Sequence, residues 1–431
     1  MPSKEDLKYA VEPLLSREDD PDGGNSIRNS AHQCTSINFS RPIIAFVNSK
    51  SGGKKGPAVL ESLTRLLGAK QVFDLQHHNP EVVLRQIWDS FSKLQQDGSH
   101  NADETISNLK ILACGGDGTA VWLLKTVKNL SLTPTPPVAV IPLGTGNQLS
   151  RTLGWGKGFM PTDQKVKTHL EKVKRGDARK LDCWRFRMFG QKSIFGSVPK
   201  HVVKEVESAA ANSENPGDVV MEGFTWNYFS VGVNVEAAYR FHSLRNKHPW
   251  LAFARKANQF WYGFYSIYAG WFCGAPPIGA NLDLEILTDE GGWKTVELTS
   301  DIKALVVLNH HNYGGGKDIW GMRRNKENDA GQNMEEPAPD DGKFEIVGLK
   351  NGWHMAMVLM ECKHGVRLAQ CSSARLKFKT RKPKKKSRCF FHLDGEPWKQ
   401  TIPSHENSKP LLVEISNGGQ SAVITREAFD Y

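Results

Sequence analysis

The chain has 431 residues, of which 39% are hydrophobic and 9% aromatic. This length and composition favour a globular protein with a substantial core, divided into about two domains. The formal net charge of +10 indicates an anionic partner, which is a nucleotide, a nucleic acid or an anionic membrane surface.

The seven cysteines are scattered and form no C-x-x-C pair, so neither a disulfide framework nor a zinc module is expected. The N-terminal residues are charged and lack the apolar segment of a signal peptide. No run approaches the roughly 18 apolar residues of a membrane-spanning helix. These features predict a reducing, cytoplasmic location, with peripheral association at any membrane.

Residues 1–40 are polar, with seven acidic and four basic residues, and we expect this arm to be disordered. From residue 41, short apolar runs typical of buried strands alternate with patterns of helical spacing. The strand-like runs cover 42–48, 71–75, 109–114 and 138–142, and the helical patterns cover 60–67, 79–96 and 119–129. This alternation predicts an α/β domain with a mainly parallel sheet over residues 41–180.

Beyond residue 180, short strand-like runs separated by turn signals replace the alternation, from 224–229 to 411–415. Such a series is typical of an antiparallel sandwich. Helical stretches near 235–272 and 354–364 interrupt it. We therefore predict a second, β-rich domain over residues 181–431, whose last strands could return to the first domain.

Three strand-like runs of the first half end in turns of glycine and small polar residues, at Asn48–Gly53, Gly115–Thr119 and Gly144–Asn147. In a parallel sheet these turns lie at one edge, where ligands bind. Glycine lets backbone N–H groups approach a phosphate, and the helix that follows points its positive end at the anion. The three turns together predict a phosphate-binding edge, although tight turns need glycine in any case.

Asp117 is the one acid among these turns. It suits contact with Mg²⁺, with a ribose or with water around the phosphates, and it equally suits the N-cap of a helix. The chain contains neither G-x-x-x-x-G-K-[ST] nor G-x-G-x-x-G after its first strand, which excludes a Walker-type NTPase and argues against a dinucleotide fold.

The three turns, read as Val47–Gly53, Cys114–Thr119 and Pro142–Asn147, resemble the catalytic domain of diacylglycerol kinases. The Gly-Gly-Asp-Gly-Thr element is similar to one shared with 6-phosphofructokinases and NAD kinases. The second half resembles the accessory domain of the same family in Asn227–Val233, Phe241–Arg245, Asn309–Gly316, Asp340–Gly342 and Leu393–Pro397. The resemblance runs from about residue 41 to past 400 and is closest to the plant type, which lacks zinc modules and EF-hands.

This resemblance implies a phosphofructokinase-like first domain, a larger β-sandwich as the second, and ATP with Mg²⁺ in a cleft between them. It implies transfer of a phosphoryl group from ATP to the primary hydroxyl of diacylglycerol, giving phosphatidic acid and ADP in lipid signalling. The residues implied to hold the nucleotide are Asn48, Ser51, Gly52, Gly53, Gly115, Gly116, Gly118, Thr119, Gly144, Thr145, Gly146 and Asn147.

The resemblance also implies that the Asp394-Gly395-Glu396 element supplies the acid that accepts the proton of the lipid hydroxyl. Either Asp394 or Glu396 fits this role, and Asp-Gly is also a common hairpin turn. Asp341 resembles the family's aspartate at a structural Mg²⁺ site, with an Asp-Gly turn as the alternative. The sequence departs from the family at Gln148 and Asn234, where an acid is often found.

Two segments are candidates for lipid contact. A basic segment that includes Lys382, Lys384, Lys385, Lys386 and Arg388 suits an anionic bilayer, a nuclear-import signal or a solvated loop. The aromatic stretch 260–272 suits a buried helix better than an interfacial one.

Two other functions compete with diacylglycerol phosphorylation. A related lipid kinase would act on a sphingoid base or ceramide, and an inactive protein would bind nucleotide as a scaffold. Nucleic-acid binding is not expected, because the basic residues gather in one short segment rather than over a face.

Overall fold

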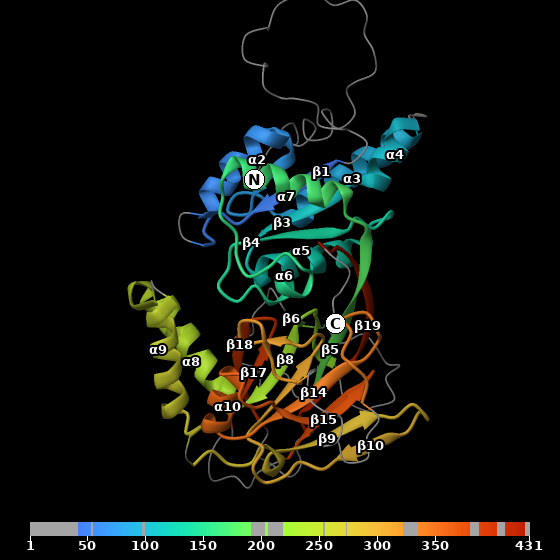
Figure 1. The fold of residues 1–431 in the computed structure, drawn as a ribbon. Helices are drawn as coiled ribbons and strands as arrows, with labels where there is room; N and C mark the ends of the chain where they lie inside the picture. The colour runs from blue at the N-terminus through green and yellow to red at the C-terminus, as the bar shows by residue number, and fades with distance from the viewer. Residues whose placement is uncertain are drawn as a thin grey trace, which may run out of the picture. The chain divides into compact units, whose positions relative to one another are not determined.

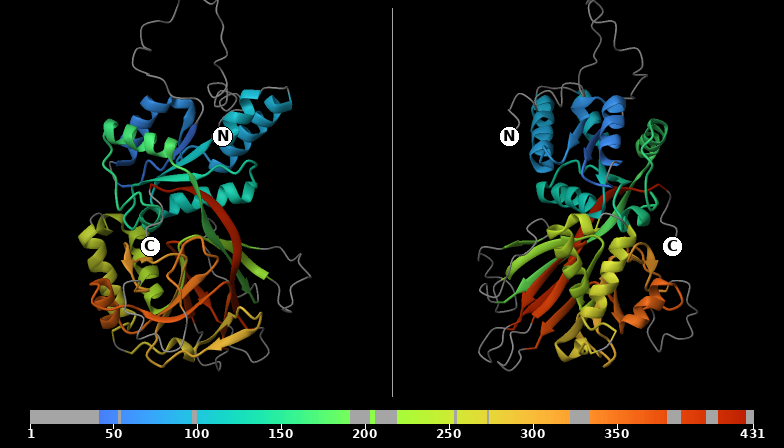
Figure 2. Two further views of the ribbon diagram at one scale, coloured as in Figure 1. Left: turned by 45° about the vertical axis from the view of Figure 1, so that its right-hand side comes forward. Right: turned by 90° about the vertical axis from the view of Figure 1, so that its left-hand side faces the viewer.

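The computed structural model describes residues 42–52, 55–96, 100–190, 203–205, 219–252, 255–272, 274–321, 334–379, 388–402 and 410–426. The chain divides into two compact units (Figures 1 and 2). The first comprises Met1–Lys180 with Ser421–Asp430, and the second comprises Leu181–Gln420 with Tyr431. The arm expected to be disordered, residues 1–40, lies outside the described residues.

The first unit is built on a parallel sheet with the strand order β2-β1-β3-β4. Its strands are β1 (Ile43–Val47), β2 (Val72–Asp74), β3 (Lys110–Gly115) and β4 (Val138–Pro142). Every residue of β1 and β4 is buried, as expected for parallel strands that are covered on both faces. The alternation of apolar runs and helical patterns therefore predicted this sheet.

Two groups of helices pack against this sheet, α2 with α7 and α3 with α4 and α5. The helices are α2 (Lys55–Leu67), α3 (Pro80–Gln96), α4 (His100–Asn108), α5 (Asp117–Leu130), α6 (Gln148–Thr152) and α7 (Asp163–Arg175), with the short η1 (Ala69–Gln71) after α2. In α2, Val59, Leu63 and Leu67 recur every four residues and are buried. The helical spacing predicted α2, α3 and α5, but the short helices α4 and α6 and the polar helix α7 were missed.

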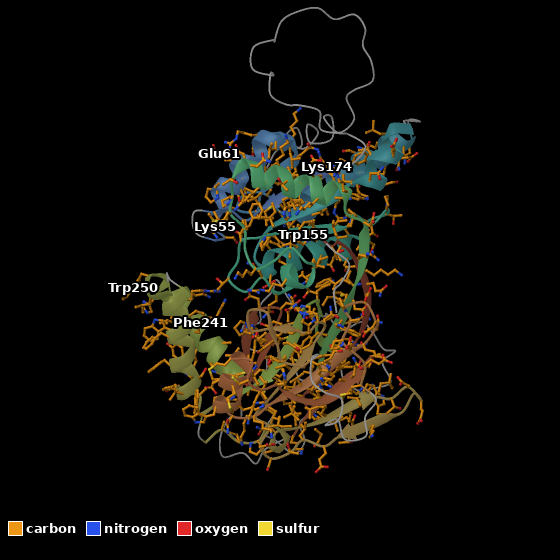
Figure 3. All side chains as sticks on the ribbon, in the orientation of Figure 1. Lys55, Glu61, Trp155, Lys174, Phe241 and Trp250 are labelled. Carbon is orange, nitrogen blue, oxygen red and sulfur yellow. The ribbon has the colours of Figure 1, made fainter. Side chains whose placement is uncertain are left out.

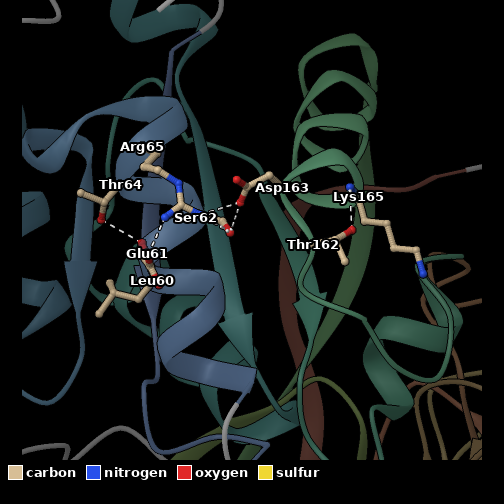
Figure 4. A network of polar contacts seen from close by, with 8 residues as sticks. All are labelled: Leu60, Glu61, Ser62, Thr64, Arg65, Thr162, Asp163 and Lys165. Atoms are coloured by element: carbon tan, nitrogen blue, oxygen red, sulfur yellow. Dashed lines mark hydrogen bonds and ion pairs between the residues drawn. The ribbon is translucent and has the colours of Figure 1, made fainter. Parts of the chain in front are cut away.

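A polar network joins α2 to the start of α7 (Figure 4). The Asp163 carboxylate accepts hydrogen bonds from the Ser62 hydroxyl at 2.5 Å and the Arg65 guanidinium at 2.7 Å. Thr162 caps α7, since its hydroxyl accepts a bond from the backbone N–H of Lys165. The network fixes these two helices beside each other at the surface of the first unit.

The second unit contains two sheets made mainly of antiparallel pairs. One sheet has the strand order β10-β9-β16-β19. Strand β5 also pairs with β19, and β7 pairs with β5 and with β6. These strands are β5 (Ala178–Phe189), β6 (Val203–Glu205), β7 (Val219–Thr225), β9 (Leu282–Leu287), β10 (Trp293–Val296), β16 (Ala374–Phe378) and β19 (Leu412–Ile424).

The other sheet has the order β15-β14-β11-β8-β17-β18, and β12 with β13 forms a separate two-stranded ladder. The strands are β8 (Tyr228–Gly232), β11 (Ala304–Leu308), β12 (Asn312–Tyr313), β13 (Lys317–Asp318), β14 (Phe344–Leu349), β15 (Val366–Cys371), β17 (Arg388–Leu393) and β18 (Glu396–Thr401). One buried cluster joins both sheets, with Phe186 and Leu376 from the first and Phe229 and Phe391 from the second. Burying each such side chain contributes about 1.5–3 kcal/mol, so this shared core holds the second unit together.

The second unit also contains three α-helices and two short 3-10 helices in its described residues. They are α8 (Val233–Lys247), η3 (Pro249–Ala252), α9 (Arg255–Tyr268), η4 (Ile278–Ala280) and α10 (Gly352–Leu359). Helix α8 packs against β17 and β18 on one side and against α9 on the other. No helix in the described part of the chain has the length and apolar character needed to cross a bilayer.

Two predictions for the second unit were wrong. The run 224–229 is not one strand, because β7 ends at Thr225 and β8 begins at Tyr228, with a turn between them. The aromatic stretch is not a buried helix over its whole length, because Phe260, Phe264, Ile267 and Tyr268 are exposed, whereas Trp271 is buried. Helical periodicity is the same whether the apolar face meets a core or solvent, so the pattern could not distinguish these cases.

Candidate functional site

The three glycine turns of the first unit lie against one another at the carboxyl ends of β1, β3 and β4. The backbone N–H of Leu143 donates to the carbonyl of Gly115 at 2.7 Å, and that of Asn48 donates to Cys114 at 2.9 Å. A Cβ added to Gly144 would come within 2.6 Å of the Gly116 Cα, closer than real Cβ atoms approach. Glycine at these positions therefore lets the second and third turns touch through their backbones.

Asp117 ties the second turn to the third. Its Oδ1 accepts a hydrogen bond from the backbone N–H of Leu149 at 3.0 Å, at the start of α6. Burial raises the pKa of this carboxyl, and the amides of Gln148, Leu149 and Asn147 together with the charge of Arg151 act in the opposite direction. The N-cap of α5 itself is Gly116, so Asp117 caps the neighbouring helix rather than its own.

Asn147 closes the third turn in a left-handed backbone conformation, with φ of 50°. Its side-chain N–H₂ donates to the carbonyls of Gly144 at 2.7 Å and Lys157 at 3.0 Å. Its buried Oδ1 accepts no hydrogen bond within the described part of the chain and lies beside Gly144. A buried amide oxygen of this kind suits a hydroxyl donor or a cation.

The predicted nucleotide residues fall into three groups by exposure. Gly52, Gly118 and Thr145 are exposed; Gly115, Thr119 and Asn147 are buried; Asn48, Ser51, Gly116, Gly144 and Gly146 are partly exposed. Gly53 lies outside the described residues. The 14-residue helix α5 starts within the second turn, at Asp117. Exposed glycines at the positive end of a helix can bind phosphate oxygens.

In the second unit, Asp394 and Gly395 form the two-residue turn between β17 and β18, where Leu393 pairs with Glu396. Both have positive φ, 46° for Asp394 and 96° for Gly395, as a type I′ hairpin requires. The Asp394 carboxylate faces inward and accepts bonds from the Thr225 hydroxyl and from the backbone N–H groups of residues 226–228. Burial raises its pKa to about 6, although these four donors oppose the shift. Asp394 therefore fixes the turn at which β7 ends and β8 begins.

Glu396 lies on the other side of the same turn and has a different environment. Its side chain is 39% exposed, and its Oε2 lies 3.8 Å from Nε2 of His242 on α8. Burial lowers the pKa of His242, and Glu396 partly offsets the shift, so the imidazole is neutral at neutral pH. An exposed carboxylate beside a neutral imidazole can accept a proton from a substrate hydroxyl.

Asp341 lies in a group of acids that raise one another's pKa. Burial is the main cause of the raised pKa of Asp341, and Asp182 adds to it; burial likewise raises the pKa of Glu345, and Asp341 adds to that. The two oxygens of Asp341 accept bonds from the backbone N–H groups of Lys343 at 2.8 Å and Ala338 at 3.3 Å. The described residues contain no group of three or more His, Cys, Asp or Glu side chains arranged to hold a metal ion.

The basic segment proposed for lipid contact lies almost entirely outside the described residues. Lys382, Lys384, Lys385 and Lys386 lie outside the described residues, and only the backbone of Arg388 is described, in β17.

Sequence reasoning missed two residues of these sites. His242 was noticed within the Phe241–Arg245 motif but was given no role, and Leu149 carries the N–H that holds Asp117. A histidine within a recognisable motif is a signal that could have been followed. A backbone N–H has no sequence signal.

Two family models match the chain in succession. The model described as the diacylglycerol kinase catalytic domain matches residues 42–186, and that described as the diacylglycerol kinase accessory domain matches residues 224–397. The first match contains all three glycine turns, and the second contains Asp341, Asp394 and Glu396.

Curated plant proteins are similar over most of the chain. Diacylglycerol kinase 1 of Oryza sativa subsp. japonica is 34% identical over 406 residues, which cover 90% of this chain and 80% of that protein. Diacylglycerol kinase 5 of Arabidopsis thaliana is 36% identical over 397 residues, which cover 88% of this chain and 76% of that protein. Among solved structures, a diacylglycerol kinase from Bacillus anthracis str. Sterne aligns with a TM-score of 0.44 and 15% identity, over 89% of this chain and 97% of its own.

Proposed function

This chain belongs to the diacylglycerol kinase family and is a diacylglycerol kinase, and we propose that it uses ATP to convert diacylglycerol into phosphatidic acid. The observation that carries the activity is the identity of 34–36% to plant diacylglycerol kinases over about nine tenths of the chain. The geometry of the turns supports ATP as the phosphoryl donor, because exposed backbone at the start of α5 suits a chain of phosphates.

In the proposed reaction, the primary hydroxyl of the lipid gives its proton to a carboxylate as its oxygen attacks the γ-phosphorus of ATP. The bond between that phosphorus and the bridging oxygen breaks, and ADP leaves with the electron pair. We assign the proton to Glu396, because its carboxylate is exposed, whereas Asp394 uses both oxygens to hold the 225–228 turn.

Mg²⁺ on the nucleotide would neutralise charge that develops on the phosphates during transfer. Cations of this kind usually take one or two protein carboxylates together with substrate phosphates. The residues present fit such an ion, since Asp117 supplies a carboxylate and Asn147 supplies a buried oxygen without a hydrogen-bond donor in the described chain. Asp117 would also keep the second and third turns together through its bond to Leu149.

A second Mg²⁺ at Asp341 would relieve the repulsion between this carboxylate and its acidic neighbours Asp182 and Glu345. Binding there can be measured without activity. We expect millimolar Mg²⁺ to raise the melting temperature of the wild-type protein and to leave that of Asp341→Asn unchanged. An equal rise in both proteins would remove Asp341 from the metal sites.

The lipid substrate lies in membranes, so the enzyme would work at an anionic bilayer surface to which it attaches peripherally. The basic segment with Lys382, Lys384, Lys385, Lys386 and Arg388 would add electrostatic attraction of about 1 kcal/mol for each charge close to the surface.

A panel of lipid acceptors tests this function. The protein is incubated with Mg²⁺ and γ-labelled ATP and with diacylglycerol, sphingosine or ceramide, and the labelled lipids are separated. We expect labelled phosphatidic acid to dominate. Preference for sphingosine or ceramide would identify the enzyme as a different lipid kinase, and no labelled lipid with bound ATP would identify an inactive nucleotide-binding protein.

A further inference from the structure

Helix α9 carries an apolar face that the described part of the chain leaves largely exposed. Phe260, Phe264, Ile267 and Tyr268 are 66%, 47%, 65% and 65% exposed. Their spacing of four, three and one residues places them on one face of the helix, and we call them the α9 stripe. Such a stripe normally faces a core, so its exposure indicates a partner surface.

Helix α9 packs against α8, and neighbouring side chains contact the residues of the stripe. Ser266, on another face of α9, is buried, and α9 packs along α8. The ring of Trp261 lies 5.5 Å from that of Phe260 and 5.9 Å from that of Phe264. The Arg240 guanidinium, on α8, lies 4.6 Å above the ring of Tyr268. The exposed rings are therefore supported by neighbours, and little conformational entropy would be lost on binding.

Trp250 extends the exposed apolar surface beyond α9. It belongs to η3, which connects α8 to α9, and it is 68% exposed. Figure 3 shows Trp250 at the end of the α8–α9 hairpin, away from Phe241 in α8. A tryptophan side chain combines a large apolar ring with one N–H donor, a combination that is enriched at membrane–water interfaces.

The segment that carries the stripe is predominantly basic, and the acid just before it, Glu236, pairs with Arg240. Residues 237–282 contain no Asp or Glu, although the whole chain has 46 acids among 431 residues. The same segment has five Lys or Arg residues, and of these Arg245 and Lys247 are exposed at the end of α8. A second copy of this surface would be repelled, because like charges would meet, whereas an anionic surface would be attracted.

We propose that the α9 stripe and Trp250 form the surface that enters the headgroup region of an anionic bilayer, with Arg245 and Lys247 beside the lipid phosphates. The 14 residues of α9 span about 21 Å, less than the roughly 30 Å of a hydrocarbon core, so the helix lies along the interface. This inference rests on the proposed function only in that the substrate is a membrane lipid.

Vesicle binding without ATP tests the surface directly. The triple variant Phe260→Ser, Phe264→Ser, Ile267→Ser is compared with the wild-type protein on vesicles of phosphatidylcholine with phosphatidylserine. The lipid concentration for half-maximal binding should rise about 1000-fold, since each of the three removed side chains contributes about tenfold, or about 1.4 kcal/mol. The control triple variant Val82→Ser, Met160→Ser, Trp293→Ser changes exposed apolar residues outside α8, η3 and α9 and should bind within about twofold of the wild type.

Two further variants keep the test decisive if the triple variant folds poorly. Trp250→Ser should weaken binding by about tenfold, because its exposed ring lies outside α9. Arg245→Glu with Lys247→Glu should weaken binding most at low salt and on vesicles that contain phosphatidylserine. Wild-type binding by both of these folded variants would overturn the proposal. So would a wild-type dimer that the α9 substitutions dissociate, because the stripe would then bind a second copy.

Turnover of a short-chain diacylglycerol dissolved as monomers separates this inference from the proposed function. The triple variant at Phe260, Phe264 and Ile267 should phosphorylate the monomeric substrate at the wild-type rate, because Glu396 pairs with His242 and not with any of these three side chains. An inactive wild-type protein that binds vesicles through α9 would contradict the proposed function alone. An active wild-type protein whose vesicle binding is unaffected by the stripe variants would contradict this inference alone.

Discussion

Asp394 and Glu396 are two residues apart, yet their carboxylates have different surroundings. The hairpin turn sends Asp394 into the protein, where it accepts four hydrogen bonds, and leaves Glu396 partly exposed beside His242. The buried acid holds backbone, and the exposed one is available to a substrate. Their roles can therefore be separated by substitution.

Glu396→Gln should lower kcat by about 100-fold or more, since an amide cannot accept the proton of the lipid hydroxyl. The melting temperature should change little, because the Glu396 side chain is 39% exposed and the glutamine keeps its size. Steady-state kinetics and thermal unfolding of the same preparation measure both effects. Glu361→Gln, at another exposed acid, is the control and should leave kcat unchanged. A kcat within about threefold of the wild type would remove Glu396 from the proton transfer.

Asp394→Asn should instead change how stability depends on pH. Burial raises the pKa of Asp394 from 3.8 to about 6, so the folded protein binds this proton more readily than the unfolded chain. The stability from the neutral form is therefore present below about pH 4 and is lost as the pH rises through 6. The asparagine variant cannot ionise. Its free energy of unfolding should gain about 2 kcal/mol relative to the wild type between pH 4 and pH 7.

Urea unfolding of both proteins at several pH values from 4 to 7 measures this difference. Any constant loss from the replaced carboxylate cancels, because only the change with pH is compared. A difference that stays the same over this range would show that Asp394 ionises at its ordinary pKa, and that the four hydrogen bonds offset the effect of burial.

At the scale of elements, the three glycine turns combine close packing with an exposed backbone. Gly144 is needed for the packing, whereas Gly118 belongs to the exposed backbone. A Cβ at Gly144 would meet the backbone of Gly116 at 2.6 Å, whereas a Cβ at Gly118 would meet nothing within 4 Å. Gly118 also lies in the first turn of α5, where alanine favours the helix by about 0.5–1 kcal/mol.

Gly118→Ala should therefore keep or slightly raise the melting temperature but weaken ATP binding by about tenfold, because the added methyl group stands where phosphates would approach. Gly144→Ala should lower the melting temperature, since the second and third turns must move apart. Calorimetric titration with Mg²⁺–ATP and thermal unfolding measure the two quantities. If Gly118→Ala bound ATP like the wild type, the phosphates would not lie over the second turn.

The elements of the first unit could be predicted because their signals are local. The apolar runs of β1, β3 and β4 are each followed by a turn that contains glycine, and the structure ends these strands within about two residues of the prediction. The break between β7 and β8 could not be predicted. The carboxylate that holds this turn belongs to Asp394, which is 168 residues away from Trp226 in the chain. The apolar residues on both sides of the break between β7 and β8 therefore have the sequence pattern of one strand.

In the candidate site, too, features with local sequence signals could be predicted, and features that depend on distant contacts could not. The meeting of the glycine turns at one edge could be predicted from the sequence, because the carboxyl ends of parallel strands lie at the same edge of a sheet. The choice between Asp394 and Glu396 required the backbone of the hairpin, since spacing alone placed them equally well. The exposure of the α9 stripe also needed the structure, because only packing shows which face of a helix lacks a neighbour.

At the scale of the whole molecule, residues 421–426 return to the first unit after the chain has built the second. Strand β19 pairs with β16 at residues 412–415 in the second unit and then with β4 through Val423. Val423 and Ile424 are fully buried, and the carbonyl of Ile424 accepts a bond from the Trp155 indole N–H at 2.8 Å. The N–H of Arg426 donates to the carbonyl of Leu153 at 3.0 Å.

A chain that stops after Gln420 should consequently have a damaged first unit and an intact pairing of β19 with β16. It loses two buried aliphatic side chains, worth about 1.5–3 kcal/mol each, and leaves the buried Trp155 N–H without its acceptor, which costs about 1–3 kcal/mol more. We expect calorimetry to show a lower melting temperature and titration to show weaker ATP binding. A chain that stops after Arg426 keeps all of these contacts and is the matched control. Equal melting and equal ATP affinity in both shortened chains would mean that the parallel sheet is complete without its last strand.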